Sequence, residues 1–378
     1  MACLEGKLVI AIEQAVAAPL CTARLADAGA RVIKIERADG DFARRYDAAA
    51  KGESSYFAWL NQGKESVCLD FKTDADAAVL WSLIKKADIL IQNLSPGALA
   101  RAGFSQQQLH AVNDQLIICN VSGYGNSAEV ADKRAYDLLV QAESGLISVS
   151  GSSKEPGRIG VSICDIGTGI TAYAAILEAL INRSVTGKGE ELSVSLFDVS
   201  AEWMTVPYLH AVYGEGAPKP VGLQHPSIAP YGAFECKDDR LVLISIQNER
   251  EWRRLCTDVL LNDALLTDNR FRSNNARVSN RAQLEKAISA VTSTLTAGEF
   301  QHRLQRANIA FGVINSAADL PHHVALRTRS VSTASGKTMQ VPAHPVQHGN
   351  NKTLNAARTP LIGEHTASVK QEFDPVND

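Results

Sequence analysis

The segment "SICDIGTGITAYAAILEALINR", residues 162–183, combines a single early carboxylate with an amphipathic helix pattern. Asp165 stands near its start and is followed closely by Gly167 and Gly169. Each glycine in a first helical turn costs about 1 kcal/mol relative to alanine, so the pair needs a reason. One interpretation is structural, because an aspartate N-cap accepts the first free N–H groups of a helix. The other is chemical: the carboxylate is a reagent, and the glycines let a ligand approach the backbone.

Other polar residues that could take part in chemistry stand at helix starts, after strands or in a proline-rich segment. They are Arg37, Arg101, Tyr136, Asp137 and His225. Each also has an ordinary structural interpretation. An aspartate or tyrosine at a helix start is usually a cap or a packing residue, and an arginine is usually a solvated surface charge. Taken singly, these residues leave both interpretations open.

The sequence argues against several other classes of protein. Its seven cysteines form no C-x-x-C pair and no zinc spacing, and their scatter fits a reducing cytosol, so we expect a cytoplasmic protein without a metal. The net charge of −3 predicts no nucleic-acid partner. The absence of an 18-residue apolar run predicts no membrane span. "GTG" lacks the G-x-G-x-x-G spacing of a dinucleotide site.

Strand and helix patterns alternate through the first half of the chain. Short apolar runs predict strands, and two amphipathic segments at 19–30 and 74–87 predict helices. The strand patterns lie at 7–12, 31–36, 66–71, 88–93 and 116–123. Such alternation predicts an α/β fold with a Rossmann-like parallel sheet covered on both faces. Ligands of these folds bind at the carboxyl ends of the strands, here in the loops after residues 93 and 123.

The pattern changes after residue 200. The proline-rich segment 214–231 is typical of a linker, and residues 232–246 predict a hairpin that turns at Lys237–Arg240. Two amphipathic helices are expected around 249–261 and 281–295. We therefore predict a large domain over 1–200, completed by about 328–378, a linker over 201–225 and a small α+β domain over 226–327.

Four stretches taken together resemble one family. They are "APLCTARLADAGARVIKIERADGD", "NQGKESVCLDFKTDADAAVLWSLIKKADILIQNLSPGALARAGF", "AYDLLVQAESGL" and "CDIGTGITAYAAILEALINRSVTGKGE". In this order they resemble the class III CoA-transferases, a family that includes formyl-CoA transferase and carnitine CoA-transferase. The resemblance covers roughly the whole chain and is strongest between residues 17 and 198.

The resemblance implies that Asp165 is the nucleophile. The substrates would be an acyl-CoA and a small carboxylic acid, with coenzyme A as a substrate, no prosthetic group and no metal. The reaction would pass through an aspartyl-CoA thioester, which is covalent catalysis. The glycine-rich start of the helix would offer backbone donors to the developing oxyanions, and its positive end would favour the anionic acceptor. The resemblance further implies an intertwined homodimer.

The family resemblance also assigns binding roles to individual residues. Arg37 and Arg101 would meet the nucleotide part of CoA, with Arg134 near by. The adenine and pantetheine path would be lined by Leu69, Phe71, Asn93, Leu94 and Ala98. The acyl group and acceptor would meet Val16, Tyr136, Asp137, Gly167, His225 and Ser227.

Two departures from formyl-CoA transferase bear on the substrate. Val16 stands where that enzyme has a glutamine, and "GLQHPSIAPYG" replaces its run of four glycines. Both argue against formate and oxalate. His225 and Ser227 could bind the far carboxylate of a longer acid. The sequence of this segment resembles that of the family branch that handles C4–C5 dicarboxylic acids such as itaconate, mesaconate, succinate, malate or citramalate.

Two alternatives remain open at this point. An α-methylacyl-CoA racemase shares the fold and moves an α-proton with a His and an Asp. Tyr136 stands at the position of that histidine, and a tyrosine with an ordinary pKa near 10 is a poor base at pH 7. A non-catalytic CoA-binding protein would use Asp165 only as a cap and would tolerate asparagine there.

Overall fold

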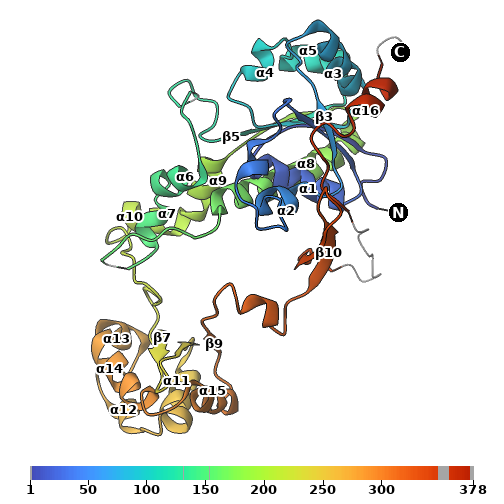
Figure 1. The fold of residues 1–378 in the computed structure, drawn as a ribbon. Coiled ribbons are helices and arrows are strands. Elements are labelled where there is room, and N and C mark those ends of the chain that lie inside the picture. The colour runs from blue at the N-terminus through green and yellow to red at the C-terminus, as the bar shows by residue number, and fades with distance from the viewer. Residues whose placement is uncertain (1, 131, 153, 348–356, 375–378) are drawn as a thin grey trace. The chain divides into compact units, whose positions relative to one another are not determined.

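The computed structural model describes residues 2–130, 132–152, 154–347 and 357–374, which divide into two compact units (Figure 1). The larger unit comprises the chain up to residue 146, residues 158–206 and the chain from residue 327. The smaller unit comprises residues 147–157 and 207–326.

A six-stranded parallel sheet forms the centre of the larger unit, with strand order β3-β2-β1-β4-β5-β6. Its strands are β1 Leu8–Ile12, β2 Arg31–Glu36, β3 Glu65–Cys68, β4 Ile89–Gln92, β5 Ile117–Ser122 and β6 Glu191–Ser195. This is the order of a doubly wound Rossmann-type sheet. The predicted α/β fold class is therefore confirmed.

Helices cover both faces of the sheet because alternate side chains of its strands point to opposite sides. Val9 and Ala11 of β1 belong to one apolar core, whereas Ile10 and Ile12 belong to a second. The first core is completed by helices α1 Ala17–Asp27, α8 Ile163–Thr186 and α9 Leu196–Trp203. The second is completed by α3 Asp74–Lys86, α5 Gln106–Val112 and α16 Thr366–Glu372. The C-terminal helix thus packs on a sheet built by the first half of the chain.

Helix α8 is long and apolar enough to meet the length and hydropathy criteria for a membrane span, with a mean hydropathy of 1.4. Cys164, Ala172, Ile176 and Ala179 along it are buried in the core of the larger unit. One side of α8 therefore packs in this core, and 39% of its apolar window is buried.

Shorter elements complete the larger unit. They are η1 Phe42–Arg45, α2 Ser55–Leu60, α4 Ala98–Arg101, α6 Asp137–Glu143 and the antiparallel hairpin β10 Thr328–Ser332 with β11 Thr338–Pro342.

The smaller unit is an antiparallel sheet with helices. The predicted hairpin is confirmed, because β7 Tyr231–Glu235 pairs with β8 Leu241–Ser245, and β9 Phe311–Val313 adds a third strand. Its helical elements are α11 Glu249–Arg254, η2 Leu255–Val259, α12 Ala264–Thr267, α13 Asn274–Ser279, α14 Arg281–Thr292, α15 Ala297–Arg306 and η3 Leu320–His322. Helix α15 and strand β9 were not predicted from the sequence.

The segment predicted as a linker, 201–225, is partly helical. It contains the end of α9 and helix α10 Thr205–Tyr213, whereas residues 214–230 lack helix and strand. The apolar pattern "TVPYLHAVY" explains why the helix forms despite a proline, which lies in its first turn where no N–H donor is needed. A further short helix, α7, spans Leu146–Val149.

Candidate active site

A cavity of about 610 Å³ lies at the carboxyl end of the sheet in the larger unit. The loops after β1, β4 and β5 form one side, and the starts of α6 and α8 form another. Doubly wound sheets bind ligands at this end, as the sequence predicted for the loops after β4 and β5. Asp165, Tyr136, Asp137 and Val16 all line this cavity, so the structure brings four of the predicted site residues together.

Asp165 lies in the first turn of α8, half-buried at the cavity wall. Its carboxylate has no hydrogen bond or ion pair within the described residues. Burial, followed by the negative charge of Asp137, raises the pKa of Asp165 to about 7. Cys164 beside it is fully buried and its thiol pKa is raised to about 11, chiefly by burial, so this cysteine is not a second nucleophile at neutral pH.

The start of α8 is capped by another residue, and Asp165 is not its N-cap. Ser162 occupies the N-cap position without a side-chain cap bond. The Asp137 Oδ1 atom instead accepts the N–H groups of Cys164 at 2.8 Å and Asp165 at 3.2 Å. The structural interpretation of Asp165 as a cap is therefore wrong, because an aspartate from α6 performs that task.

Asp137 is itself fixed by Gln141 one turn further along α6. The Gln141 Nε2 atom donates to Asp137 Oδ2 at 2.7 Å, and the Gln141 Oε1 atom accepts from the N–H of Ile159 at 2.9 Å. Gln141 is fully buried. Asp137 is thus a positioned acceptor at the head of α8 and a fixed negative charge near Asp165.

The two glycines after Asp165 serve helix packing, which corrects the expectation that they admit a ligand. A Cβ atom on Gly167 would lie 2.1 Å from the Trp203 side chain of α9. A Cβ on Gly169 would lie 2.6 Å from the carbonyl oxygen of Ala17 in α1. The α-carbon of Gly167 is buried against a tryptophan, and a substrate contact of Gly167 stays a prediction.

Three of the residues predicted to bind CoA, namely Asn93, Leu94 and Arg134, also line the Asp165 cavity. Arg101 lines a neighbouring cavity of about 460 Å³ that shares Leu94 with the first. Asn93 holds the loop after β1, because its amide accepts the Gln14 N–H at 3.0 Å and donates to the Gln14 carbonyl at 2.8 Å.

The other predicted CoA residues lie outside these two cavities. Leu69 and Phe71 belong to the second apolar core, and Arg37 is exposed with Asp39 3.7 Å away. Ala98 begins α4. A role for these four in binding CoA stays a prediction.

His225 and Ser227 belong to the smaller unit. The His225 ring stacks on Tyr231 with 5.3 Å between centroids, and its Nδ1 accepts the Ser227 N–H at 3.2 Å. A role for the pair at a distal carboxylate stays a prediction.

An aromatic wall of the cavity was missed by the sequence analysis. Tyr46 lies 5.7 Å from Phe42 and 5.4 Å from Tyr56 between ring centroids, and all three line the cavity. Arg158 also lines it. The signal was present as a concentration of aromatic residues between positions 42 and 57 in a chain with only 6% aromatics.

The sequence as a whole matches one family model, described as CoA-transferase family III, over residues 4–366. The chain belongs to this family. The predicted class of enzyme, a CoA-transferase, is thereby confirmed.

Relatives that are named for different substrates have similar sequence identity to this chain. An acetyl-CoA:oxalate CoA-transferase of Acetobacter aceti is 32% identical over 98% of this chain and 95% of that protein. A succinyl-CoA:glutarate CoA-transferase of Mus musculus is 30% identical over 98% of this chain and 86% of that protein. The crystal structure of a CAIB/BAIF family protein from Brucella suis has a TM-score of 0.85 and 30% identity, covering 99% of this chain and 100% of that one.

The cavity beside Asp165, with its charged lining residues, is the candidate active site of this CoA-transferase. Within the described ranges of the chain, no group of three or more His, Cys, Asp or Glu side chains is arranged to hold a metal ion.

Proposed function

We propose that this CoA-transferase moves CoA from an acyl-CoA donor, such as succinyl-CoA, to a C4–C5 dicarboxylic acid through a covalent thioester on Asp165. One observation carries the proposal: a half-buried, unpaired carboxylate with a pKa of about 7 at the wall of a 610 Å³ cavity. A perturbed carboxylate in such a cavity is a strong candidate for a reacting group.

The reaction follows from the chemistry of a carboxylate. The Asp165 carboxylate attacks the donor thioester carbonyl, which forms a mixed anhydride and expels CoA as its thiolate. The thiolate attacks the aspartyl carbonyl, which gives the Asp165–CoA thioester and releases the donor acid. The acceptor carboxylate then attacks this thioester, and the returning thiolate takes the acceptor acyl group from the second anhydride. Asp165 ends as a free carboxylate, as it began.

The electrostatics of the site favour acylation of Asp165. Burial and the Asp137 charge destabilise the Asp165 carboxylate, which raises its pKa. Acylation removes that charge. The same two causes therefore favour the anhydride and the thioester, while the raised basicity makes the ionised carboxylate a better nucleophile.

Backbone donors for the developing oxyanions come from α1 in this proposal. The expected donors in the first turn of α8 are already engaged, since Asp137 accepts from Cys164 and Asp165. Helix α1 begins at Ala17 with no side-chain cap, and residues 15–17 line the cavity. Its first free N–H groups can therefore meet an oxyanion.

Two arginines support a dicarboxylic substrate. The cavity is lined by Asp132, Asp137 and Asp165, which would repel a second carboxylate. Arg134 and Arg158 line it as well, and the arginine fork suits a carboxylate. Relatives named for glutarate and mesaconate add support for a five-carbon dicarboxylate, whereas a relative named for oxalate makes oxalate a further acid to test. Itaconate, malate and citramalate remain acids to test beside them.

A homodimer in the cytoplasm completes the proposal. Helix α10 buries none of its residues and exposes several large apolar side chains, as interfaces do before assembly. They are Val206, Tyr208, Leu209, Val212 and Tyr213. All seven cysteines are free thiols, as in a reducing compartment. Sedimentation equilibrium of the purified protein should give twice the chain mass of 40.6 kDa, and a monomer would contradict the dimer.

Peptide mass spectrometry tests the covalent step. The protein is mixed with succinyl-CoA, quenched in acid and digested, and a CoA adduct is expected on the peptide that holds Asp165. Chasing the adduct with glutarate, mesaconate, itaconate, malate, citramalate, oxalate and acetate shows which acid removes it. If folded protein acquires no adduct from any of several donors, the mechanism is contradicted, and α-proton exchange in D₂O then tests for a racemase.

The rate of adduct formation should depend on pH through Asp165. Only the ionised carboxylate attacks, so we expect the single-turnover rate to rise about tenfold per pH unit below a pKa of about 7 and to level off above it. Quenched-flow mass spectrometry between pH 5 and 9 measures this. A rate that is already flat at pH 5 would show that Asp165 keeps the ordinary pKa of an aspartate.

A further inference from the structure

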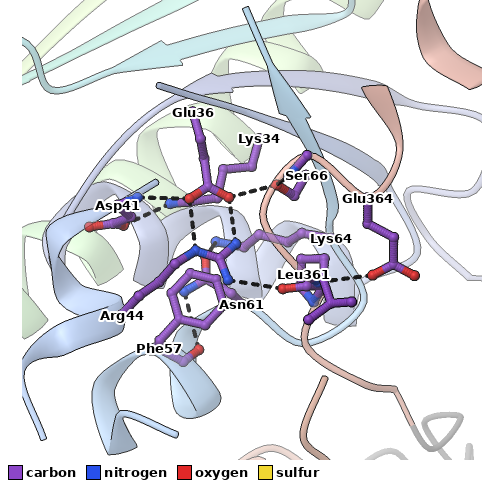
Figure 2. Close-up of polar contacts among 12 residues, drawn as sticks. Lys34, Glu36, Asp41, Arg44, Phe57, Asn61, Lys64, Ser66, Leu361 and Glu364 are labelled. Atoms are coloured by element: carbon purple, nitrogen blue, oxygen red, sulfur yellow. Dashed lines mark hydrogen bonds and ion pairs between the residues drawn. The ribbon is translucent and has the colours of Figure 1, made fainter. Parts of the chain in front are cut away.

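Four charged side chains lie fully buried beside the loop between β1 and α1. Lys64 Nζ lies 2.7 Å from Glu13 Oε1, and Lys34 Nζ lies 3.0 Å from Asp41 Oδ2 and 3.4 Å from Glu13 Oε1. Figure 2 shows Lys34, Asp41 and Lys64 in this cluster, together with Glu36 and Arg44 next to it. All four side chains are 0% exposed.

Stability alone does not account for such a cluster. Removing charges from water is costly, and apolar residues of similar volume commonly stabilise a fold as well or better. The attested benefit of buried charges is that they specify one arrangement of the backbone around them. The question is therefore which arrangement this cluster specifies.

Asp41 connects the cluster to two segments that line the Asp165 cavity. Its Oδ1 atom accepts the N–H of Ala15 at 3.2 Å and the N–H of Ala43 at 2.9 Å, while Oδ2 accepts from Lys34. Ala15 belongs to the loop before α1. Ala43 lies in η1, whose Phe42 and following Tyr46 form the aromatic wall.

The loop at Ala15 needs to be held in place. Ala15 has a φ of 64°, in the left-handed region that a residue with a Cβ adopts only at a cost. Gln14 before it is clamped by Asn93, and Ala15 is clamped by Asp41. The strained conformation directs the chain into α1, whose first residue, Ala17, lines the cavity and whose start has no side-chain cap.

We propose that Asp41, anchored by Lys34, is a positioning residue for acyl transfer: it fixes the loop at Ala15, and so the N–H groups at the start of α1, for the transition state at Asp165. The inference rests on the proposed function. Asp41 touches no substrate in this proposal. Its effect falls on the transition state, because donors displaced by a fraction of an ångström still admit CoA but no longer match the oxyanion.

The test compares four variants of the full-length enzyme with the wild type, with succinyl-CoA and the best acceptor from the chase experiment as substrates. Asp41→Asn opposes an amide N–H₂ to the Lys34 ammonium and loosens the anchor. Lys34→Met with Asp41→Asn keeps the buried charges balanced, in case the single variant does not fold. Ala15→Gly with Asp41→Asn adds a residue that adopts positive φ without a steric cost.

Asp88→Asn is the matched control. Asp88 accepts the N–H of Leu8 at 2.9 Å and pairs with Lys7 and Arg183. Like Asp41, it is an aspartate that holds a backbone N–H while paired with a basic side chain, but it lies at the opposite end of β1 from the cavity. It should lower thermal stability and leave kcat unchanged.

We expect kcat to fall about tenfold to a hundredfold in the two Asp41 variants that retain Ala15, with KM for succinyl-CoA within about threefold of wild type. Adding Ala15→Gly should restore about fivefold of the loss, because the loop then reaches its conformation without strain. A merely structural role would lower thermal stability without lowering kcat at a constant KM, and Ala15→Gly would then restore no activity.

Unchanged kcat in both Asp41 variants overturns the inference, and so does a loss of kcat that Ala15→Gly leaves untouched. Either result leaves the proposed function intact, since the wild type still acquires its CoA adduct. A wild-type enzyme that never acquires the adduct overturns the proposed function, and the inference with it.

Discussion

Replacing Asp165 by asparagine should abolish CoA transfer while making the protein more stable. The amide cannot form the anhydride or the thioester, so we expect kcat to fall by about 10⁴-fold or more, as for other covalent nucleophiles. Because Asp165 is not the cap of α8, the helix start should not change. Steady-state transfer and the CoA adduct on the peptide of residue 165 measure the loss.

The gain in stability depends on pH, and its sign follows from the raised pKa. The unfolded chain ionises Asp165 near pH 4, whereas the folded protein resists ionisation until about pH 7. The burial of this carboxylate therefore costs stability progressively between about pH 4 and 7 and by a constant amount above pH 7. Asp165→Asn removes the cost, so we expect about 2–4 kcal/mol of added stability at pH 8 and almost none at pH 4.

Urea unfolding of the two proteins at both pH values checks this. Asp165→Ala is the companion variant, because it also removes the charge but adds a small cavity. If Asp165→Asn kept full transfer activity, Asp165 would not be the nucleophile, and the non-catalytic interpretation would gain its main support. If Asp165→Asn lost activity but had the same stability as the wild type at both pH values, burial of the Asp165 carboxylate would not cost the fold stability.

Much of the fold follows from local patterns in the sequence. The run "RVIKIE" coincides with β2, in which Val32, Ile33 and Ile35 are buried. The predicted helix over 74–87 runs one residue beyond α3, which has acids at its start and lysines at its end. The hairpin at Lys237–Arg240 follows from its polar turn. Helix α15 was missed, although Thr296 and Glu299 form the capping box that marks its start.

The site was less predictable because its key relations are between residues distant in the sequence. Asp137 caps a helix that begins 26 residues later, at Ile163, and no local pattern distinguishes that from Asp165 capping its own helix. Gly167 and Gly169 suggested a ligand, but a glycine needed against Trp203 or Ala17 looks the same in sequence. The buried charges at Glu13, Lys34 and Lys64 stand in unremarkable strand and loop segments, and only the fold shows that they meet.

Replacing Asp137 by alanine should have the second-largest effect on turnover. The change removes the acceptor of the N–H groups of Cys164 and Asp165, so the first turn of α8 loses its cap and the nucleophile loses its position. We expect kcat to fall about 10²-fold, and stability to fall by about 1–2 kcal/mol. Thr73→Ala is the control, because Thr73 caps α3 through the Asp76 N–H. It should cost similar stability and leave kcat unchanged.

Replacing Asp137 by asparagine separates its charge from its cap. One amide oxygen can still accept the two N–H groups, but the negative charge that helps raise the pKa of Asp165 is gone. The pH profile of adduct formation should therefore move to lower pH, while kcat at pH 8 falls much less than in Asp137→Ala. Because acylation removes the Asp165 charge, loss of the neighbouring charge should also lower the fraction of enzyme held as the CoA thioester at equilibrium. A profile that keeps its midpoint in this variant would assign the raised pKa to burial alone and leave Asp137 with the cap as its single task.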